Sequence, residues 1–245
     1  MLLVRHIADD KIEAGIDEAG RGSFWGPIMA GAVIWPKEAE WTDDHKAIAA
    51  QIRDSKKIAA KKRERICTDI KKLATAWGIG QVSAQEIDEN GIQWANQEAF
   101  RRALHDMNTR YEPIPMRLLI DGVIGMEDTI EGREQFNIID GDALYMPIAA
   151  ASILAKVEHD MWVQNYCTEN PECAERYHLQ SCKGYGTAKH REGLGIYGAH
   201  ALHRRTFVRK YVSDGANGGA GVAIPVASTS KTVCRIKLRV QVKED

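Results

Sequence analysis

An alternating apolar run over residues 12–18 constrains the fold of this chain most strongly, because it ends in two adjacent carboxylates, Asp17 and Glu18. Apolar side chains at every second position predict a β-strand with one buried face. These side chains are Ile12, Ala14 and Ile16. Asp17 then points from the opposite face, and Glu18 follows where the strand ends. Two carboxylates in this position predict the floor of an active site.

A glycine-rich turn follows the two carboxylates directly. Gly20 and Gly22 flank Arg21, and residues without a Cβ can adopt positive φ and let a ligand approach the backbone closely. The alternative is a solvated hairpin turn, which is the usual role of acidic, glycine-rich loops. The positions of other acidic residues in the chain can distinguish between these two interpretations.

The composition is that of an ordinary globular protein. With 245 residues and 44% hydrophobic residues, the chain can form one large domain or two small ones around a substantial core. Its formal net charge is -1, so a polyanionic partner would have to be bound by local basic clusters. No run approaches the roughly 18 apolar residues of a membrane span, and the N-terminus turns acidic too early for a secretory signal. We therefore expect a cytoplasmic protein without a membrane partner.

The five cysteines favour a reducing compartment, because their number is odd and no Cys-x-x-Cys occurs. Three of them surround His178 at spacings that loosely resemble a zinc knuckle. They are Cys167, Cys173 and Cys182. These spacings are too irregular to predict a zinc site.

Hydrophobic periodicity predicts an α/β domain. Strands are expected at residues 12–18, 28–35, 79–82, 117–122 and 136–140, the first two as neighbours. Helical apolar faces run through residues 66–77, 92–107 and 147–165. Ser83 and Glu86 form a capping-box pattern, which predicts the start of a further helical turn.

The composition changes from Ser213 onward to Gly, Ala and Ser, which is typical of a flexible linker. We therefore expect one domain over residues 1–212, and a linker and tail of unassigned role over residues 213–245. Residues 233–242 alternate apolar with basic side chains and could form an isolated strand.

Carboxylates also follow other predicted strands. Asp121 lies at the end of one strand, and Asp142 follows another. In open α/β sheets, ligands bind at the carboxyl ends of the strands, where Asp17 also lies. Several converging carboxylates form a hard, oxygen-rich site of the kind that holds Mg²⁺ or Mn²⁺. Without cations, these groups would repel one another and raise each other's pKa.

Such a site predicts phosphodiester hydrolysis, because two ions roughly 3.5–4 Å apart can activate a water and stabilise the leaving oxygen. Basic clusters would then hold the flanking phosphates. They lie around Lys56, Lys183 and Arg204. A competing interpretation uses two carboxylates as the acid and base of a glycosidase. Sugar sites usually display aromatic platforms, so 7% aromatic residues and the basic clusters argue against it.

Seven sequence blocks, in this order, resemble the ribonuclease HII family, the type 2 ribonucleases H. They are residues 15–22, 54–57, 120–122, 141–142, 149–156, 183–187 and 203–207. The resemblance covers about residues 12–210. It implies an α/β, ribonuclease H-like fold: a mixed five-stranded sheet flanked by helices, with a helical C-terminal extension.

The resemblance also implies an activity. A member of this family is a metal-dependent endonuclease that uses Mg²⁺ or Mn²⁺ to hydrolyse the RNA strand of RNA–DNA hybrids. It also nicks duplex DNA 5′ of single embedded ribonucleotides, as ribonucleotide excision repair requires, and leaves 3′-hydroxyl and 5′-phosphate ends. The expected partners are therefore RNA–DNA hybrid and ribonucleotide-containing duplex DNA, bound by a monomer.

Individual residues match the family's functional positions. The matching metal-binding, catalytic carboxylates are Asp17, Glu18, Asp121 and Asp142. The backbone that reads the 2′-hydroxyl matches Gly20, Arg21 and Gly22, and phosphate contacts match Ser55, Lys56 and Lys183. Tyr185 matches the tyrosine that stacks on the sugar of the adjoining deoxynucleotide. Ser152 and Lys156, on the long predicted helix, are expected to be packing and surface residues.

Two positions depart from the family pattern. Asp140 stands where the family often has lysine, and Cys182 stands where histidine is common. The extra negative charge beside Asp142 could weaken metal or phosphate binding. The chain could therefore instead be a catalytically weakened hybrid-binding module. A related nuclease that prefers long hybrids is a third possibility.

Overall fold

The computed structural model describes residues 2–127 and 130–212, and this part contains a mixed five-stranded sheet. Its strands are β1 (Glu13–Ala19), β2 (Ile28–Ile34), β3 (Ala76–Val82), β4 (Arg117–Asp121) and β5 (Glu134–Ile138). Their order is β3-β2-β1-β4-β5. β1–β2 and β2–β3 are antiparallel, whereas β1–β4 and β4–β5 are parallel. The expected fold class and the pairing of the first two strands are therefore confirmed.

The register of the two central parallel strands brings two carboxylates together. Ile16 of β1 lies opposite Ile120 of β4. The next residues in the same direction are Asp17 and Asp121, and neighbouring strands lie about 4.8 Å apart. Two residues that are distant in the sequence thus become neighbours in the sheet.

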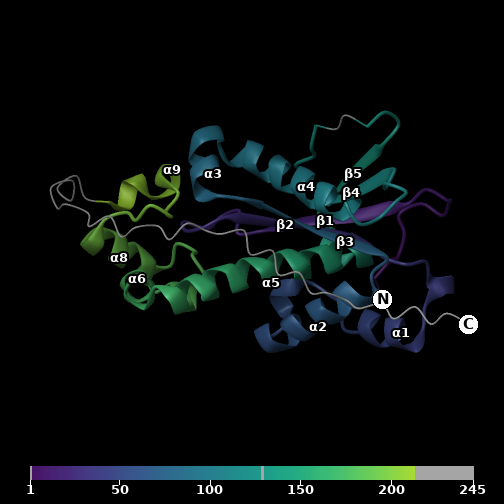
Figure 1. Ribbon diagram of the computed structural model, residues 1–245, viewed down its shortest axis with the longest axis horizontal. Coiled ribbons are helices and arrows are strands. Elements are labelled where there is room, and N and C mark those ends of the chain that lie inside the picture. Colours follow the sequence, from purple (N-terminus) through teal and green to yellow (C-terminus); the bar gives the residue numbers. More distant parts are fainter. Residues whose placement is uncertain (1, 128–129, 213–245) are drawn as a thin grey trace, which may run out of the picture. The chain divides into compact units, whose positions relative to one another are not determined.

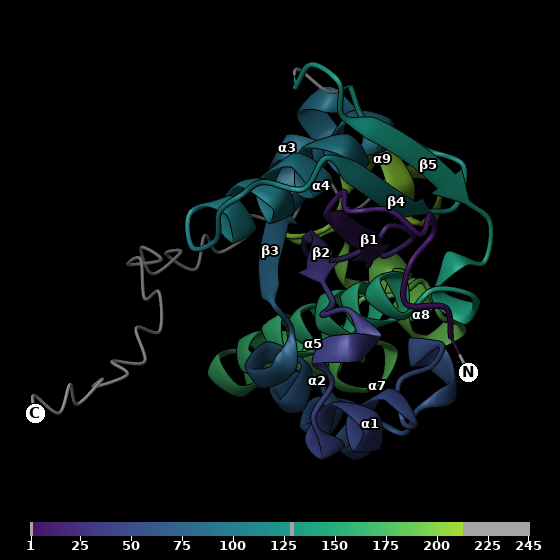
Figure 2. The same ribbon diagram turned by 90° about the vertical axis from the view of Figure 1, so that its right-hand side faces the viewer.

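Helices cover both faces of the sheet. The helices up to the end of the sheet domain are α1 (Asp43–Ala49), α2 (Ala60–Leu73), α3 (Ala84–Asn90), α4 (Ile92–Asn108) and α5 (Met146–Glu169). In Figure 1, α3 and α4 lie on one side of the sheet and α5 on the other. Figure 2 shows α5 between the sheet and α2. Each face therefore has its own apolar core.

The two cores differ in the side chains that fill them. On the α4 side, Ile16 packs with Ala99 and Phe100. On the α5 side, Ile153 and Leu154 pack with residues of α1 and α2. Full burial of each large apolar side chain contributes about 1.5–3 kcal/mol, so both helices are held firmly against the sheet.

The helical extension follows α5 and gathers at one end of the sheet (Figure 1). It comprises α6 (Pro171–Arg176), α7 (Leu179–Cys182), α8 (Ala188–Tyr197) and α9 (Arg205–Val208). A third apolar cluster holds it together, and Trp25, from the segment between β1 and β2, is buried in this cluster. The extension is thus packed against the chain that follows the glycine turn.

Some predicted boundaries are wrong: the strand expected at 136–140 is Glu134–Ile138, and the largest difference is at β3. The helix expected through residue 77 ends at Leu73, and Trp77, Gly78 and Gly80 belong to β3. A Cβ at Gly80 would lie 2.0 Å from the carbonyl oxygen of Ala99 in α4. These glycines therefore let α4 approach the strand, whereas the sequence analysis read them as a helix end. The capping box at Ser83 is present as predicted.

The predicted tail and its possible strand at 233–242 lie outside the described residues. The division of the chain at residue 212 therefore stays a prediction. Within the described part, no helix combines the length and apolar character that crossing a membrane requires.

Candidate active site

Asp17 and Glu18 point to opposite sides of β1, as adjacent strand residues do. Asp17 is only 6% exposed and faces α5, where the hydroxyl of Ser152 lowers the pKa of its carboxylate. Glu18 faces α4, where the side chain of Asn96 lowers the pKa of its carboxyl group. The direction predicted for Asp17 agrees with this arrangement, because Ile16 lies in the α4-side core.

Asp121 and Asp142 are joined through the backbone. Asp121 ends β4, and Asp142 lies in a short 3-10 helix, η3 (Gly141–Ala143). The N–H of Asp142 donates a hydrogen bond to Oδ1 of Asp121 at 3.3 Å. Asp140, with a φ of 53°, precedes this turn in the left-handed conformation. The turn thus fixes one carboxylate beside the other.

All four predicted catalytic carboxylates have raised pKa values, and burial is the largest cause for each. The charges of Glu18 and Asp121 raise the pKa of Asp17 further. The charge of Asp121 also raises the pKa values of Glu18 and Asp142. These groups therefore lie in one electrostatic environment, as the sequence analysis expected.

Lys56 provides a counter-charge to this group. It lies in a second 3-10 helix, η2 (Ser55–Lys57). Burial lowers its pKa, but Asp142 and Asp17, among other carboxylates, raise it, and the net effect is a pKa above the usual value. Its positive charge in turn lowers the pKa of Asp121. The structure thus places Lys56 near the carboxylates, where a phosphate-binding cation is needed.

The donor atoms fit a hard divalent cation. In the present arrangement, no group of three or more His, Cys, Asp or Glu side chains in the described part of the chain is gathered closely enough to hold a metal ion. The four carboxylates nevertheless offer only oxygen ligands, which Mg²⁺ and Mn²⁺ prefer. Burial and the charges of neighbouring carboxylates raise their pKa values, and a bound cation would favour the ionised forms again.

Ser152 takes part in this site, although the sequence analysis expected only a packing residue. Its hydroxyl lowers the pKa of Asp17 and lies 3.0 Å from the hydroxyl of Ser55. The carbonyl of Ser55 accepts a hydrogen bond of 2.7 Å from Arg63. The available signal was a single hydroxyl in the small-residue run that begins α5. Both Ser55 and Lys56 are therefore carried by a loop that is tied to α5.

The two glycines of the turn have different environments. Gly20 has a φ of +80°, and a Cβ there would lie 2.3 Å from Cδ2 of buried His159. Gly22 is not left-handed, and a Cβ there would meet none of the described atoms within 4 Å. The fold thus requires glycine at position 20. At position 22 the fold leaves open space beside the backbone.

Tyr185 lies against this turn. Its hydroxyl accepts a hydrogen bond of 3.2 Å from the N–H of Gly20, and its backbone forms a β-bridge with Ser23. The ammonium group of Lys156 lies 5.2 Å from the centre of the tyrosine ring. Tyr185 and the glycine turn therefore form one unit, which we call the turn–tyrosine unit.

Arg204 has a structural role and does not hold phosphate as expected. It is fully buried, and its guanidinium donates to the carbonyls of Arg21 at 2.8 Å and Gly26 at 3.0 Å. Burial lowers its pKa to about 10. Arg204 thus supports the glycine turn from beneath, while Arg21 itself is exposed.

Lys183 lies apart from the other predicted residues. It follows α7 in the left-handed conformation, with a φ of 50°. Its charge lowers the pKa of the Cys167 thiol, although burial raises that pKa more. Among the described residues, no hydrogen bond or ion pair joins Lys183 to the carboxylates. The structure therefore brings together ten of the eleven predicted site residues, in the carboxylate group with its loop and in the turn–tyrosine unit.

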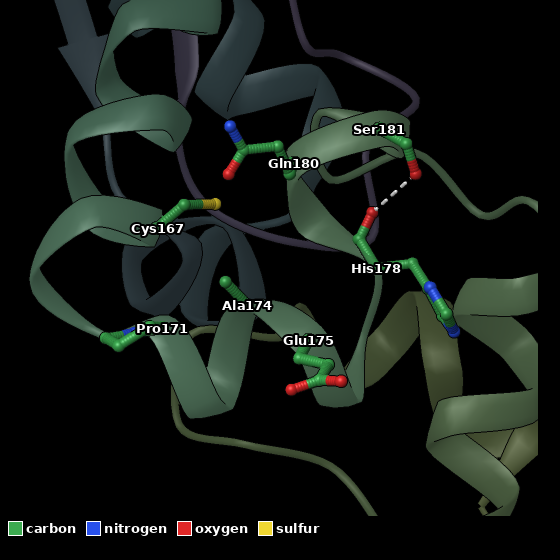
Figure 3. A pocket seen from close by; sticks show the side chains of 7 residues that line it. All are labelled: Cys167, Pro171, Ala174, Glu175, His178, Gln180 and Ser181. Carbon is green, nitrogen blue, oxygen red and sulfur yellow. Dashed lines mark hydrogen bonds between the residues drawn. The ribbon is translucent and has the colours of Figure 1, made fainter.

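A pocket of about 280 Å³ lies in the helical extension, between α5, α6 and α7 (Figure 3). Cys167 and His178 line it, but the imidazole of His178 points away from the thiol. None of the seven lining residues belongs to the predicted site. The pocket therefore contributes nothing to the carboxylate chemistry.

Comparisons with known proteins give one consistent result. The sequence profile of the family described as Ribonuclease HII matches residues 14–211. Ribonuclease HII of Prochlorococcus marinus is 43% identical over 197 residues, which cover 80% of this chain and 96% of that protein. The crystal structure of the ribonuclease H2 from Pyrococcus horikoshii OT3 matches with a TM-score of 0.63 and 24% identity, over 81% of this chain and 96% of that chain. Bst-RNase HIII, crystallised in complex with Mn²⁺, matches with a TM-score of 0.59 and 17% identity, over 84% of this chain and 70% of that chain. Both structures share the fold of this chain.

Proposed function

The chain belongs to the ribonuclease HII family of endoribonucleases, and we propose that it nicks duplex DNA 5′ of single embedded ribonucleotides. It also hydrolyses the RNA strand of RNA–DNA hybrids, and both reactions leave 3′-hydroxyl and 5′-phosphate ends. One observation carries the proposal: β1 carries the mutually repelling carboxylates Asp17 and Glu18 near its end, and the turn that follows it has open space at Gly22. This arrangement pairs a cation site with a backbone that a sugar can reach.

The carboxylates would hold the cations. Two Mg²⁺ or Mn²⁺ ions supply activation of water and stabilisation of the leaving oxygen when they are bound. Asp17, Glu18, Asp121 and Asp142 are the proposed ligands. The Mn²⁺ of the Bst-RNase HIII complex supports a divalent cation, because that protein shares the fold.

Other side chains keep the cation site in order. The hydroxyl of Ser152 stabilises the ionised form of Asp17, because it lowers the pKa of that carboxylate. Lys56 stabilises ionised Asp121 and Asp142 by its charge. With Ser55 beside it, Lys56 is placed to contact a phosphate of the cleaved strand.

The turn–tyrosine unit would read the sugar. Only the 2′-hydroxyl distinguishes RNA from DNA at a given nucleotide. A backbone amide or carbonyl beside Gly22 can hydrogen-bond to that hydroxyl, because no Cβ blocks the approach. Tyr185, partly exposed and fixed by Gly20, would stack on the adjoining deoxyribose.

A nicking assay tests the proposal. The protein is incubated with Mg²⁺ and a labelled DNA duplex that contains one ribonucleotide, and Asp17→Asn serves as the inactive control. We expect a single nick 5′ of the ribonucleotide. A folded wild-type protein that cuts neither this duplex nor an RNA–DNA hybrid, in Mg²⁺ or Mn²⁺, would contradict the proposal.

The second candidate function is a hybrid-binding module with weakened catalysis. The charge of Asp140 favours it, because this charge raises the pKa values of Asp121 and Asp142 and so opposes their ionised forms. The same duplex separates the two functions. The module would bind it without turnover, and Asp17→Asn would then change nothing that the assay measures.

A further inference from the structure

Two buried imidazoles contact each other in the helical extension. His190 lies in α8 and His203 in the loop before α9, and their Nε2 atoms are 3.0 Å apart. The rings are 0% and 1% exposed, respectively. Buried polar groups need defined partners, so this pair has to be satisfied within the protein.

Backbone groups at both ends of the pair fix its protons. The N–H of His200 donates to Nδ1 of His203 at 2.9 Å, so that nitrogen carries no proton. Neutral His203 is then protonated on Nε2, which donates to Nε2 of His190. The proton of His190 is therefore on Nδ1, which lies 3.0 Å from the carbonyl oxygen of Tyr185. Only one arrangement of the two ring protons satisfies every contact.

A third proton does not fit this chain of hydrogen bonds. Protonation of His190 would turn an N–H toward the N–H of His203. If the Nε2 proton of His203 moved to Nδ1 of the same ring, it would point at the backbone N–H of His200. Burial lowers the pKa of His190 and lowers that of His203 to about 3, in agreement with a neutral pair.

The pair spans the segment that continues the glycine turn. On one side of this segment, Ser23 forms a β-bridge with Tyr185, and on the other, Trp25 forms one with His203. The N–H of Gly26 also donates to the carbonyl of Leu202 at 2.9 Å. The hydrogen bond between the imidazoles thus closes a ring of contacts around residues 23–26.

We propose that His190 and His203 are positioning residues for sugar recognition, because this neutral pair holds the backbone of Tyr185 at a fixed distance from the glycine turn. The inference rests on the proposed function, in which Tyr185 and the turn read the junction between ribonucleotide and deoxynucleotide. The pair contacts none of the four carboxylates, and it acts through the backbone of Tyr185 and through the segment that continues the glycine turn.

The test compares two substrates, a single-ribonucleotide duplex and an RNA–DNA hybrid without a junction. His203→Phe keeps an aromatic ring but removes both ring nitrogens. We expect it to lower kcat/KM on the first substrate about tenfold and on the second less than about threefold. His203→Gln places an amide donor near the lost Nε2–H. We expect it to restore the ratio of the two kcat/KM values to within about threefold of the wild-type ratio. The matched control is His105→Gln, an exposed position on α4.

A double-mutant comparison separates positioning from a general structural effect. In a Tyr185→Ala background, His203→Phe should change the ratio of the two kcat/KM values no further. An equal loss on both substrates, or an additive loss in that background, would overturn the inference. A wild-type protein that cuts neither substrate would instead contradict the proposed function.

NMR of the wild-type protein tests the pair without any variant. Two-bond ¹⁵N–¹H correlations should show the Nε2–H tautomer for His203 and the Nδ1–H tautomer for His190, both unchanged down to about pH 5. The opposite tautomer for either ring, or titration of either ring near pH 6.5, would overturn the inference. This measurement can overturn the inference even if His203→Phe fails to fold.

Discussion

Asp17 and Asp121 lie on neighbouring strands of one sheet, whereas the glycine turn is held by side chains from the distant helical extension. Tyr185 and Arg204 contact the turn across 165 and 183 residues of sequence. The carboxylate group thus depends on the sheet and on α5, and the turn–tyrosine unit depends on the extension. Chemistry and sugar reading should therefore be separable by mutation.

The largest expected effect is a loss of chemistry on every substrate. Asp17→Asn should lower kcat on the order of 10³-fold for both the single-ribonucleotide duplex and the hybrid, because it removes a cation ligand. Duplex binding in a gel-shift assay should change little. A loss confined to one substrate would contradict the separation of the two regions.

A substitution in the glycine turn should impair cleavage of the single-ribonucleotide duplex and leave the stability of the fold intact. Gly22→Ala should lower kcat/KM on the single-ribonucleotide duplex about 10²-fold, because a methyl group fills the space left for the sugar. Its thermal midpoint should stay within about 1 °C of the wild type, since the added Cβ meets no protein atom within 4 Å among the described residues.

Gly20→Ala is the matched variant for this prediction. It combines a φ of +80° with a clash against His159, so it should cost about 1–3 kcal/mol of unfolding free energy. Calorimetry on both variants checks the contrast. Equal destabilisation by the two alanines would show that both glycines serve the fold alone.

A smaller effect should follow from Ser152→Ala. The variant removes a hydroxyl that lowers the pKa of Asp17, so that pKa should rise further. Activity requires the ionised carboxylate, and the acid limb of the pH–kcat profile should therefore move to higher pH. At neutral pH we expect about a tenfold loss. Ser181→Ala, an exposed serine of α7, should leave both the rate and the limb unchanged.

The smallest effect concerns stability without metal. The pKa of Asp121 is higher in the folded protein than in the unfolded chain, so its contribution to stability is lost as the pH rises through the folded value. At pH 7.5 and without metal, Asp121→Asn should therefore raise the thermal midpoint slightly. Added Mg²⁺ should stabilise the wild type more than the variant. A lower midpoint for the variant would contradict the raised pKa.

The placement of the carboxylates could be predicted from the sequence alone. The carboxylates lie at strand ends, and a period of two places Asp17 on the face opposite Ile16 without any knowledge of distant contacts. The structure agrees with that placement. Local patterns were sufficient here because β1 and β4 are regular strands.

Distant contacts were not predictable in the same way. Arg204 looks like a surface cation in the sequence, yet the fold buries it beneath the turn. Ser152 looks like a small packing residue, but its hydroxyl lowers the pKa of Asp17 because α5 packs against β1. The tautomers of His190 and His203 depend on backbone groups that only the folded chain supplies.

Anomalous diffraction from crystals of the protein soaked in Mn²⁺ can show whether Asp17 and Asp121 share a cation. We expect Mn²⁺ bound by carboxylate oxygens of Asp17 and Asp121, with Glu18 and Asp142 completing the site. Mn²⁺ bound only elsewhere, with Asp17 and Asp121 sharing no ion at saturating concentration, would contradict this expectation.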